Sequence, residues 1–251
     1  MRHLILDLDA PLMSFGGDLV DAYGVVRDFP AKSMLAGLFA NALGWERHDA
    51  DAQAALQERL VMGSARIAEG QRQREFQTAK LEANDRGWTT RGRVEGRAGG
   101  ADTYKSPHIR YRDMDADARV LIACRLDPAD AAPDLDALAT SLVRPERPLF
   151  IGRKPFLPSR PLFRGIVEAA TIPDALVAAL AASSGDPLLR PVPEIRAQWP
   201  LRELTGDALA QAIAGGARED ELTDERHWPA GVHAGLRRVM YGRLAWPEAT
   251  A

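Results

Sequence analysis

Residues 144–165 form the most strongly basic stretch of the chain, with six cations and one acid, Glu146, which gives a local charge of +5. Guanidinium and ammonium groups bind phosphate oxygens, and Gly152 ahead of Arg153 would let backbone amides approach a phosphate closely. Prolines recur too often for a helix and disfavour a central strand, so the segment is predicted to be an extended loop. Five of its residues are expected to contact RNA: Arg147, Gly152, Arg153, Lys154 and Arg160.

Three aromatic rings alternate with these cations, at Phe150, Phe156 and Phe163. Such rings can stack on the unpaired bases of a single strand, or they can fill the hydrophobic core. We expect the rings to be buried and the cations to bind RNA phosphates.

The start of a predicted helix at Phe29–Ser33 is a second candidate anion site. A helix N-terminus offers unpaired N–H groups and the positive end of the helix dipole, and Lys32 and Ser33 add a charge and a hydroxyl. Arg27 lies just ahead of this start. Most helix starts bind only water, so the prediction requires that the other basic segments lie nearby.

Residues 104–112 mix cations with aromatic rings, as the surfaces that bind single-stranded RNA do. Binding through Lys105, His108, Arg110 and Arg112 is the first interpretation. The second is a metal-independent ribonuclease, with His108 as acid and base and Lys105 as electrostatic stabiliser. One of three tyrosines would complete that set: Tyr23, Tyr104 or Tyr111. A lone histidine is more often structural, so binding is expected rather than catalysis.

The sequence lacks the motifs of several common enzyme sites. It has no G-x-x-x-x-G-K-[ST] phosphate loop and no G-x-S-x-G elbow. Its five histidines are scattered, and its single cysteine, Cys124, lies in an apolar run that predicts a buried, inert thiol. No metal and no cofactor are therefore expected.

Bulk properties restrict where the chain acts and how it can bind RNA. The formal charge is −3, so any nucleic-acid contact must come from local basic patches. No run of about 18 apolar residues and no signal peptide are visible, and no disulfide can form within the chain. We expect a cytoplasmic protein without membrane contact.

Hydrophobic periodicity predicts an α+β fold. Strands are expected at Arg2–Leu8, Leu60–Ile67 and Arg119–Leu126, and helices from Pro30 to Gly44 and over Pro133–Val143. This order is that of a ferredoxin-like fold without its last strand, a fold that also underlies RNA-recognition modules.

Two further regions complete the expected single domain of residues 1–251. Residues 71–105 are polar, rich in glycine and carry three excess positive charges, which predicts an arm or hairpin projecting from a core formed by residues 1–165. Residues 166–251 are expected to be a less regular, β-rich extension. Its predicted elements are helices at Asp174–Ser183 and Asp207–Ala214 and a strand at Arg237–Leu244. The acidic residues 219–225 are predicted to be a solvated loop. Residues 113–117 are predicted to be an acidic turn after a strand at Ile109–Arg112.

Five stretches, taken in chain order, follow one family pattern. They are Leu6–Gly16 with its Pro-Leu-Met-Ser-Phe-Gly ending, Arg27–Ser33, Phe76–Thr78, Arg112–Ala118, and Pro148–Lys154 followed by Pro161–Gly165. The ordered set, from about residue 4 to residue 165, resembles the CasD family of the RAMP superfamily. The last third of the chain adds nothing to this resemblance.

The resemblance implies a ferredoxin-like core with an arm, and a non-catalytic role in antiviral defence as a subunit of the type I-E CRISPR Cascade complex. Such a subunit binds the 5′ handle of the guide RNA (crRNA) and caps the backbone filament beside the large subunit, so it meets target DNA only through the complex. The resemblance adds Ser14, Phe15 and Gly16 to the expected RNA contacts. Type I-C relatives cut the guide precursor with a Tyr/Lys/His set, so an endoribonuclease using Lys105, His108 and Tyr23 remains the alternative.

Overall fold

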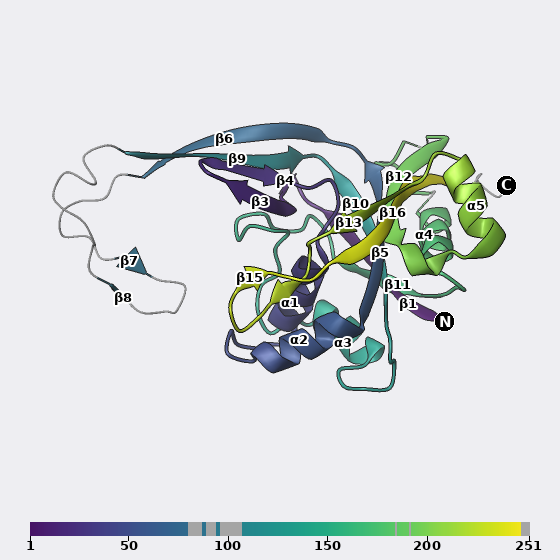
Figure 1. The fold of residues 1–251 in the computed structure, drawn as a ribbon, viewed down its shortest axis with the longest axis horizontal. Coiled ribbons are helices and arrows are strands. Elements are labelled where there is room, and N and C mark those ends of the chain that lie inside the picture. Colours follow the sequence, from purple (N-terminus) through teal and green to yellow (C-terminus); the bar gives the residue numbers. More distant parts are fainter. Residues whose placement is uncertain (80–86, 89–93, 96–106, 184, 191, 247–251) are drawn as a thin grey trace.

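The computed structural model describes residues 1–79, 87–88, 94–95, 107–183, 185–190 and 192–246. Its centre is a seven-stranded sheet with the order β11-β1-β10-β5-β12-β16-β13, in which neighbouring strands run antiparallel (Figure 1). The strands are β1 (Arg2–Asp9), β5 (Leu60–Ala68), β10 (Arg119–Leu126), β11 (Phe163–Glu168), β12 (Glu194–Pro200), β13 (Arg218–Leu222) and β16 (Arg237–Ala245).

Four of these strands and two helices form the ferredoxin-like unit. In chain order the unit is β1, α1 (Lys32–Ala42), β5, β10, α3 (Leu135–Val143) and β11, and the strand order β11-β1-β10-β5 is that of the ferredoxin-like sheet. The α+β prediction is confirmed, and β11 supplies the missing last strand. Because β11 spans residue 165, the core does not end there, and residues 166–168 belong to it.

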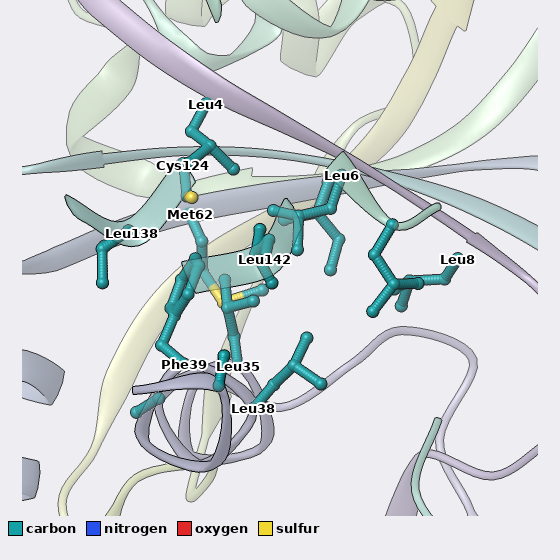
Figure 2. Close-up of a cluster of buried hydrophobic side chains, with 14 of the residues drawn as sticks. Leu4, Leu6, Leu8, Leu35, Leu38, Phe39, Met62, Cys124, Leu138 and Leu142 are labelled. Atoms are coloured by element: carbon teal, nitrogen blue, oxygen red, sulfur yellow. The ribbon is translucent and has the colours of Figure 1, made fainter. Parts of the chain in front are cut away.

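Both faces of the central sheet are covered by apolar side chains. For this reason nearly all residues of strand β1 are buried. Leu4, Leu6 and Leu8 enter a cluster with Phe39 of α1 and Leu138 of α3 (Figure 2). The alternate residue Ile5 enters a second cluster with α4 (Ile172–Ala181) on the other face. Alternating side chains of a strand point to opposite faces, so the sheet lies between two apolar layers.

The arm begins as a long two-stranded ribbon that leaves the body of the molecule (Figure 1). Strand β6 (Gln71–Ala79) pairs antiparallel with β9 (His108–Ala116), from Gln71 opposite Ala116 to Ala79 opposite His108. The predicted strand at Ile109–Arg112 is therefore part of the arm. The predicted acidic turn at residues 113–117 is wrong, because Asp113 and Asp115 lie within β9 and are buried. Much of the stretch from residue 80 to residue 106 lies outside the described residues.

Short elements complete the described chain, and some of them pair with the ribbon. Strand β9 also pairs with β2 and, in parallel, with β4, which in turn pairs with β3. These elements are β2 (Leu12–Met13), β3 (Gly16–Val20), β4 (Tyr23–Val26), α2 (Ala50–Arg59), β7 (Gly87–Trp88), β8 (Val94–Glu95), the 3-10 helix η1 (Leu201–Glu203), α5 (Gly206–Ala214), β14 (Arg226–His227) and β15 (Val232–His233).

The C-terminal third is more ordered than its sequence suggests. Strands β12, β16 and β13 extend the central sheet beyond β5, and α4, α5 and β16 agree with the predicted elements. The acidic residues 219–225 are not a solvated loop, because β13 pairs with β16 and Asp224 is buried. Within the described ranges, no helix has the length and apolar character needed to cross a membrane.

Candidate nucleic-acid interface

A cavity of about 480 Å³ lies where the ribbon, helix α1 and the proline-rich loop (residues 144–162, between α3 and β11) meet. We call it the basic groove and define it by five lining segments: residues 14–17, residues 24–26, the first turns of α1, residues 150–153 and the β14–β15 hairpin, with Arg112 of β9 at its side. Six residues that the sequence predicts to contact RNA line it together: Ser14, Gly16, Ser33, Arg112, Gly152 and Arg153.

Gly152 holds two walls of the basic groove in close contact. Its φ is +87°, and a Cβ built on it would lie 1.8 Å from the carbonyl oxygen of Ser14. The N–H of Ser14 donates to the carbonyl of the buried Ile151 at 3.3 Å. Residue 152 therefore must be glycine because two backbones cross here. Phe15 is also buried, so its ring supports this wall from the core and does not face a ligand.

Arg153 and Arg112 supply positive charge to the basic groove. Arg153 donates to Glu75 Oε2 at 3.1 Å and to the carbonyl of Asp113 at 2.9 Å, which ties the proline-rich loop to both strands of the ribbon. Burial, followed by the repulsion of Arg112, lowers the pKa of Arg153. Arg112 is exposed and forms no ion pair with any described residue. One arginine is thus held in place, and the other is available to a ligand.

The start of α1 is closed by the C-terminal part of the chain. Asp224 accepts from the N–H of Lys32 through Oδ2 at 3.1 Å and from the N–H of Ser33 through its carbonyl at 2.9 Å. Lys32 is 7% exposed, and its ammonium pairs with Glu225 at 2.8 Å. This corrects the prediction of an open helix end, because Asp224 already accepts from its N–H groups and Glu225 already pairs with Lys32. Ser33 still lines the groove, and Arg27 donates to the carbonyl of Thr223 at 3.2 Å.

Two other predicted contacts have structural partners. Arg147 donates to the carbonyls of Gly44 and Trp45 and pairs with Glu46, so it holds the turn that follows α1. Arg160 pairs with Asp9 at 2.7 Å and with Asp186 at 2.8 Å. Lys154 is exposed and forms no ion pair with the described residues, which leaves it available beside the groove.

A buried ion network lies under Arg160. Arg119 donates to both oxygens of Asp7, at 2.9 and 2.6 Å, and to Asp186 at 2.7 Å. The N–H of Leu188 and then Arg119 lower the pKa of Asp186 well below its usual range. This network fixes β1, β10 and the loop after α4 to each other.

A second network anchors the base of the ribbon. Asp115 accepts from both terminal nitrogens of the buried Arg66, at 3.1 and 3.0 Å, and from Arg72 at 2.6 Å. Arg74 pairs with Asp113 at 2.7 Å, and this bond lowers the pKa of Asp113. The acids that sequence patterns assign to a turn therefore position the ribbon beside the groove.

The ribbon and the neighbouring strand β4 together carry an exposed group of aromatic rings near the groove. Tyr23 stacks on Tyr111 with ring centroids 5.1 Å apart, and Phe76 packs against Tyr111 at 5.5 Å. Tyr23 is 46% exposed and Phe76 is 57% exposed. Aromatic faces of this kind can stack on bases or meet a partner protein.

His108 and Arg110 lie farther along the ribbon, where a hollow of about 510 Å³ includes both residues and Arg112. Tyr23 pairs with Tyr111, three residues from His108, which is about 10 Å along a strand. Tyr23 and His108 are therefore not brought together by the described backbone. Lys105 lies outside the described residues. Within those residues, no cluster of three or more His, Cys, Asp or Glu side chains could hold a metal ion.

The sequence-based predictions missed one wall of the groove. Arg226, Trp228 and His233 of the β14–β15 hairpin line the same cavity as Arg153. The available signal was the run Arg226-His227-Trp228, a cation and aromatic mixture like those of the predicted segments.

Comparisons with known proteins agree with this fold. Residues 3–240 match the family model described as CRISPR-associated protein (Cas_Cas5). A chain of a structure titled "CRISPR RNA-guided surveillance complex" is similar with a TM-score of 0.63 and 21% identity, over 98% of this chain and 91% of that chain. A chain titled "Crystal structure of Cas protein" has a TM-score of 0.54 and 21% identity, over 98% and 95%. A search of curated protein sequences finds no match.

Proposed function

Because this chain belongs to the Cas5 family of CRISPR-associated proteins, we propose that it binds the 5′ handle of a guide RNA in the basic groove. In this proposal it is a non-catalytic subunit of a type I-E Cascade surveillance complex. It acts in the cytoplasm in antiviral defence, caps the backbone filament beside the large subunit, and meets target DNA only through the assembled complex.

The observation that carries the proposal is the convergence of four separate segments on one groove. Ser14, Ser33, Arg112 and Arg153 come from positions up to 139 residues apart, yet all line the same cavity. Their types suit a single RNA strand, since arginines bind phosphates, and hydroxyl and backbone groups bind base edges. The glycines at 16 and 17 leave the backbone open on one side of this groove.

The covering of both faces of the central sheet supports the same site. In RNA-recognition modules an open sheet face carries the aromatic rings that stack on bases. Here α4 and its apolar cluster cover that face, and α1 and α3 cover the other. RNA binding on the sheet itself would require exposing a hydrophobic core. The edge formed by the ribbon and the proline-rich loop is therefore the proposed interface.

The ribbon is the proposed contact to a neighbouring subunit. It leaves the body of the molecule (Figure 1). It carries the exposed ring of Phe76, and the exposed ring of Tyr23 from the neighbouring strand β4 lies beside it, stacked on Tyr111. In the proposed complex it lies across the RNA at the boundary between handle and spacer. Exposed aromatic side chains are enriched at protein interfaces, which supports this orientation.

Removal of positive charge from the basic groove tests the proposal. The double variant Arg112→Glu, Arg153→Gln should bind single-stranded repeat RNA at least about ten-fold more weakly, because charge-assisted phosphate contacts are lost. The slope of log K against log salt should fall by about 0.7 for each lost phosphate contact. Fluorescence anisotropy across a salt series measures both quantities.

Two matched variants control this experiment. Glu75→Gln removes the carboxylate partner of Arg153 but keeps the arginine, so binding should be retained or strengthened. Arg243→Gln removes an exposed arginine of β16 that faces Glu194 at 3.6 Å, so RNA affinity should not change. Equal affinity of the groove variant and the unmodified chain would refute the proposed interface.

The alternative is a metal-independent endoribonuclease centred on His108, favoured by the hollow that His108 shares with Arg110 and Arg112. Incubation of the full chain with repeat RNA in EDTA distinguishes the two functions. We expect bound but intact RNA. Cleavage at a single position that is lost in His108→Ala would instead assign catalysis to this hollow.

A further inference from the structure

Arg226 and Arg47 place two guanidinium groups beside the same glycine. The terminal nitrogens of Arg226 and Arg47 lie 3.3 and 3.5 Å from the position that a Cβ on Gly231 would occupy. Arg47 belongs to the turn between α1 and α2, and Arg226 belongs to β14. Residues 179 positions apart in the sequence thus form one pair of like charges.

No carboxylate neutralises this pair among the described residues. The acids next to them in the sequence are engaged elsewhere, since Glu46 pairs with Arg147 and Glu225 pairs with Lys32. Burial and the charge of Arg47 lower the pKa of Arg226. Two adjacent cations without a counterion repel each other, and an anion between them would remove that repulsion.

The pair also has hydrogen-bond donors that lack partners. The Nε of Arg226 and the indole Nε1 of Trp228 are both buried and unpaired within the described chain. The guanidinium of Arg226 stacks over the Trp228 ring at 5.5 Å, which fixes its plane. A buried donor without a partner is energetically unfavourable, so these atoms favour an acceptor supplied from outside the chain.

We propose that Arg47 and Arg226 bind one phosphodiester of the RNA strand, with the Trp228 indole as a further donor, at the end of the basic groove bounded by the β14–β15 hairpin. This inference rests on the proposed function, because it takes the strand to continue from the arginines of the ribbon. Arg226 and Trp228 line the same groove as Arg112 and Arg153, so a single strand can reach both ends. Two arginines around one phosphate match the fork geometry in which guanidinium groups bind its oxygens.

The double variant Arg47→Gln, Arg226→Gln tests this subsite. The probe is a fluorescent single-stranded RNA of about ten nucleotides from the CRISPR repeat, within the range that one binding groove covers. Loss of one phosphate contact should weaken binding roughly ten-fold and lower the salt slope by about 0.7. Arg47 is exposed, so Arg47→Gln alone should keep the fold and give part of the same loss. Thermal unfolding of each variant checks folding, and Arg243→Gln serves again as the charge control.

The outcomes separate this inference from the proposed function. If the salt dependence of RNA affinity is unchanged in both Arg47 variants, and the Arg112/Arg153 variant binds more weakly, the proposed subsite is wrong. The proposed RNA site in the basic groove then remains supported. Weakened binding in the Arg47 variants alone would support the subsite and overturn the ribbon side of the groove. No RNA binding by the unmodified chain would overturn both. A further outcome is that millimolar inorganic phosphate stabilises the unmodified chain, while the salt dependence of RNA affinity is unchanged in the variants. That result would assign the arginine pair to free phosphate and overturn the RNA assignment.

Discussion

At the scale of single residues, the basic groove depends on a few positions where steric overlap or fixed ion-pair partners exclude other amino acids. Gly152 is the clearest, since any Cβ there would overlap the carbonyl of Ser14. The pairing of Arg153 with Glu75 and Asp113 shows a second kind of dependence, in which a charged side chain is fixed by partners on the ribbon. Substitutions at these positions should therefore act on structure as well as on binding.

Gly152→Ala should destabilise the fold by about 2 kcal/mol or more, because the new methyl group meets backbone and the positive φ is strained in alanine. Gly185→Ala is the matched control, since nothing lies within 4 Å of its Cβ position and its φ is ordinary. Urea unfolding of the two variants measures the difference. Equal stability of both would show that the two backbones do not cross as closely as described.

Asp186 gives a pH-dependent prediction. Folding lowers its pKa below the ordinary value of 3.8, so its contribution is present above about pH 4 and is lost as pH falls further. Asp186→Asn should therefore reduce stability at pH 7 by about 2 kcal/mol, as expected for charge-assisted hydrogen bonds to Arg119 and Arg160. The difference from the unmodified chain should vanish as pH falls, measured by urea unfolding at each pH. A difference that persists unchanged into acid would contradict this account.

Residue patterns identified some of the site but not the pairings within it. Arg112, Arg153 and Ser33 could be found because cations and hydroxyls stand in short local patterns. Lys32 fits the same pattern, but its partner Glu225 lies 193 residues away, and no local signal shows that pairing. The local charge of a segment therefore indicates where an interface lies. It does not indicate which of its cations form ion pairs within the protein.

At the scale of elements, the β6–β9 ribbon is held by buried ion pairs at its base. Asp115 joins Arg66 of β5 to Arg72 of β6, so one carboxylate fixes the ribbon to the central sheet. Arg196 of β12 extends the contact by pairing with Asp28 and Glu69. The direction of the arm is thus set by the sheet from which it leaves.

Asp115→Asn should destabilise the protein by about 3 kcal/mol, because the buried Arg66 loses its buried carboxylate partner and keeps only the exposed Glu69, at 3.2 Å. Arg238→Gln, which breaks an exposed pair with Glu219, should cost at most about 1 kcal/mol. Denaturant midpoints compare the two. A small effect at Asp115 would mean that the ribbon is anchored mainly by its backbone pairing.

Elements with strong local periodicity were predictable, and elements defined by distant partners were not. The helix expected from Pro30 to Gly44 is α1, because its apolar residues repeat at helical spacing. The acidic strand β13 has no apolar alternation and exists because β16 supplies its hydrogen bonds. Asp113 and Asp115 resemble turn residues until their arginine partners are known.

At the scale of the whole molecule, the C-terminal third decides where RNA can bind. It covers one sheet face with α4, extends the sheet with β12, β16 and β13, and closes the start of α1 with Asp224 and Glu225. These contacts remove two surfaces on which a ferredoxin-like unit could bind RNA. A surface that remains is the groove between the ribbon, the proline-rich loop and the β14–β15 hairpin.

The most direct test of this account is photochemical crosslinking of the full chain to repeat RNA that carries 4-thiouridine, with the crosslinked peptides identified by mass spectrometry. The account predicts crosslinks in residues 14–26, 150–156 and 226–233, which line or flank the basic groove. Crosslinks confined to α4, α5 and the strands beneath them would contradict it, because the RNA would then lie on the face that the C-terminal third covers.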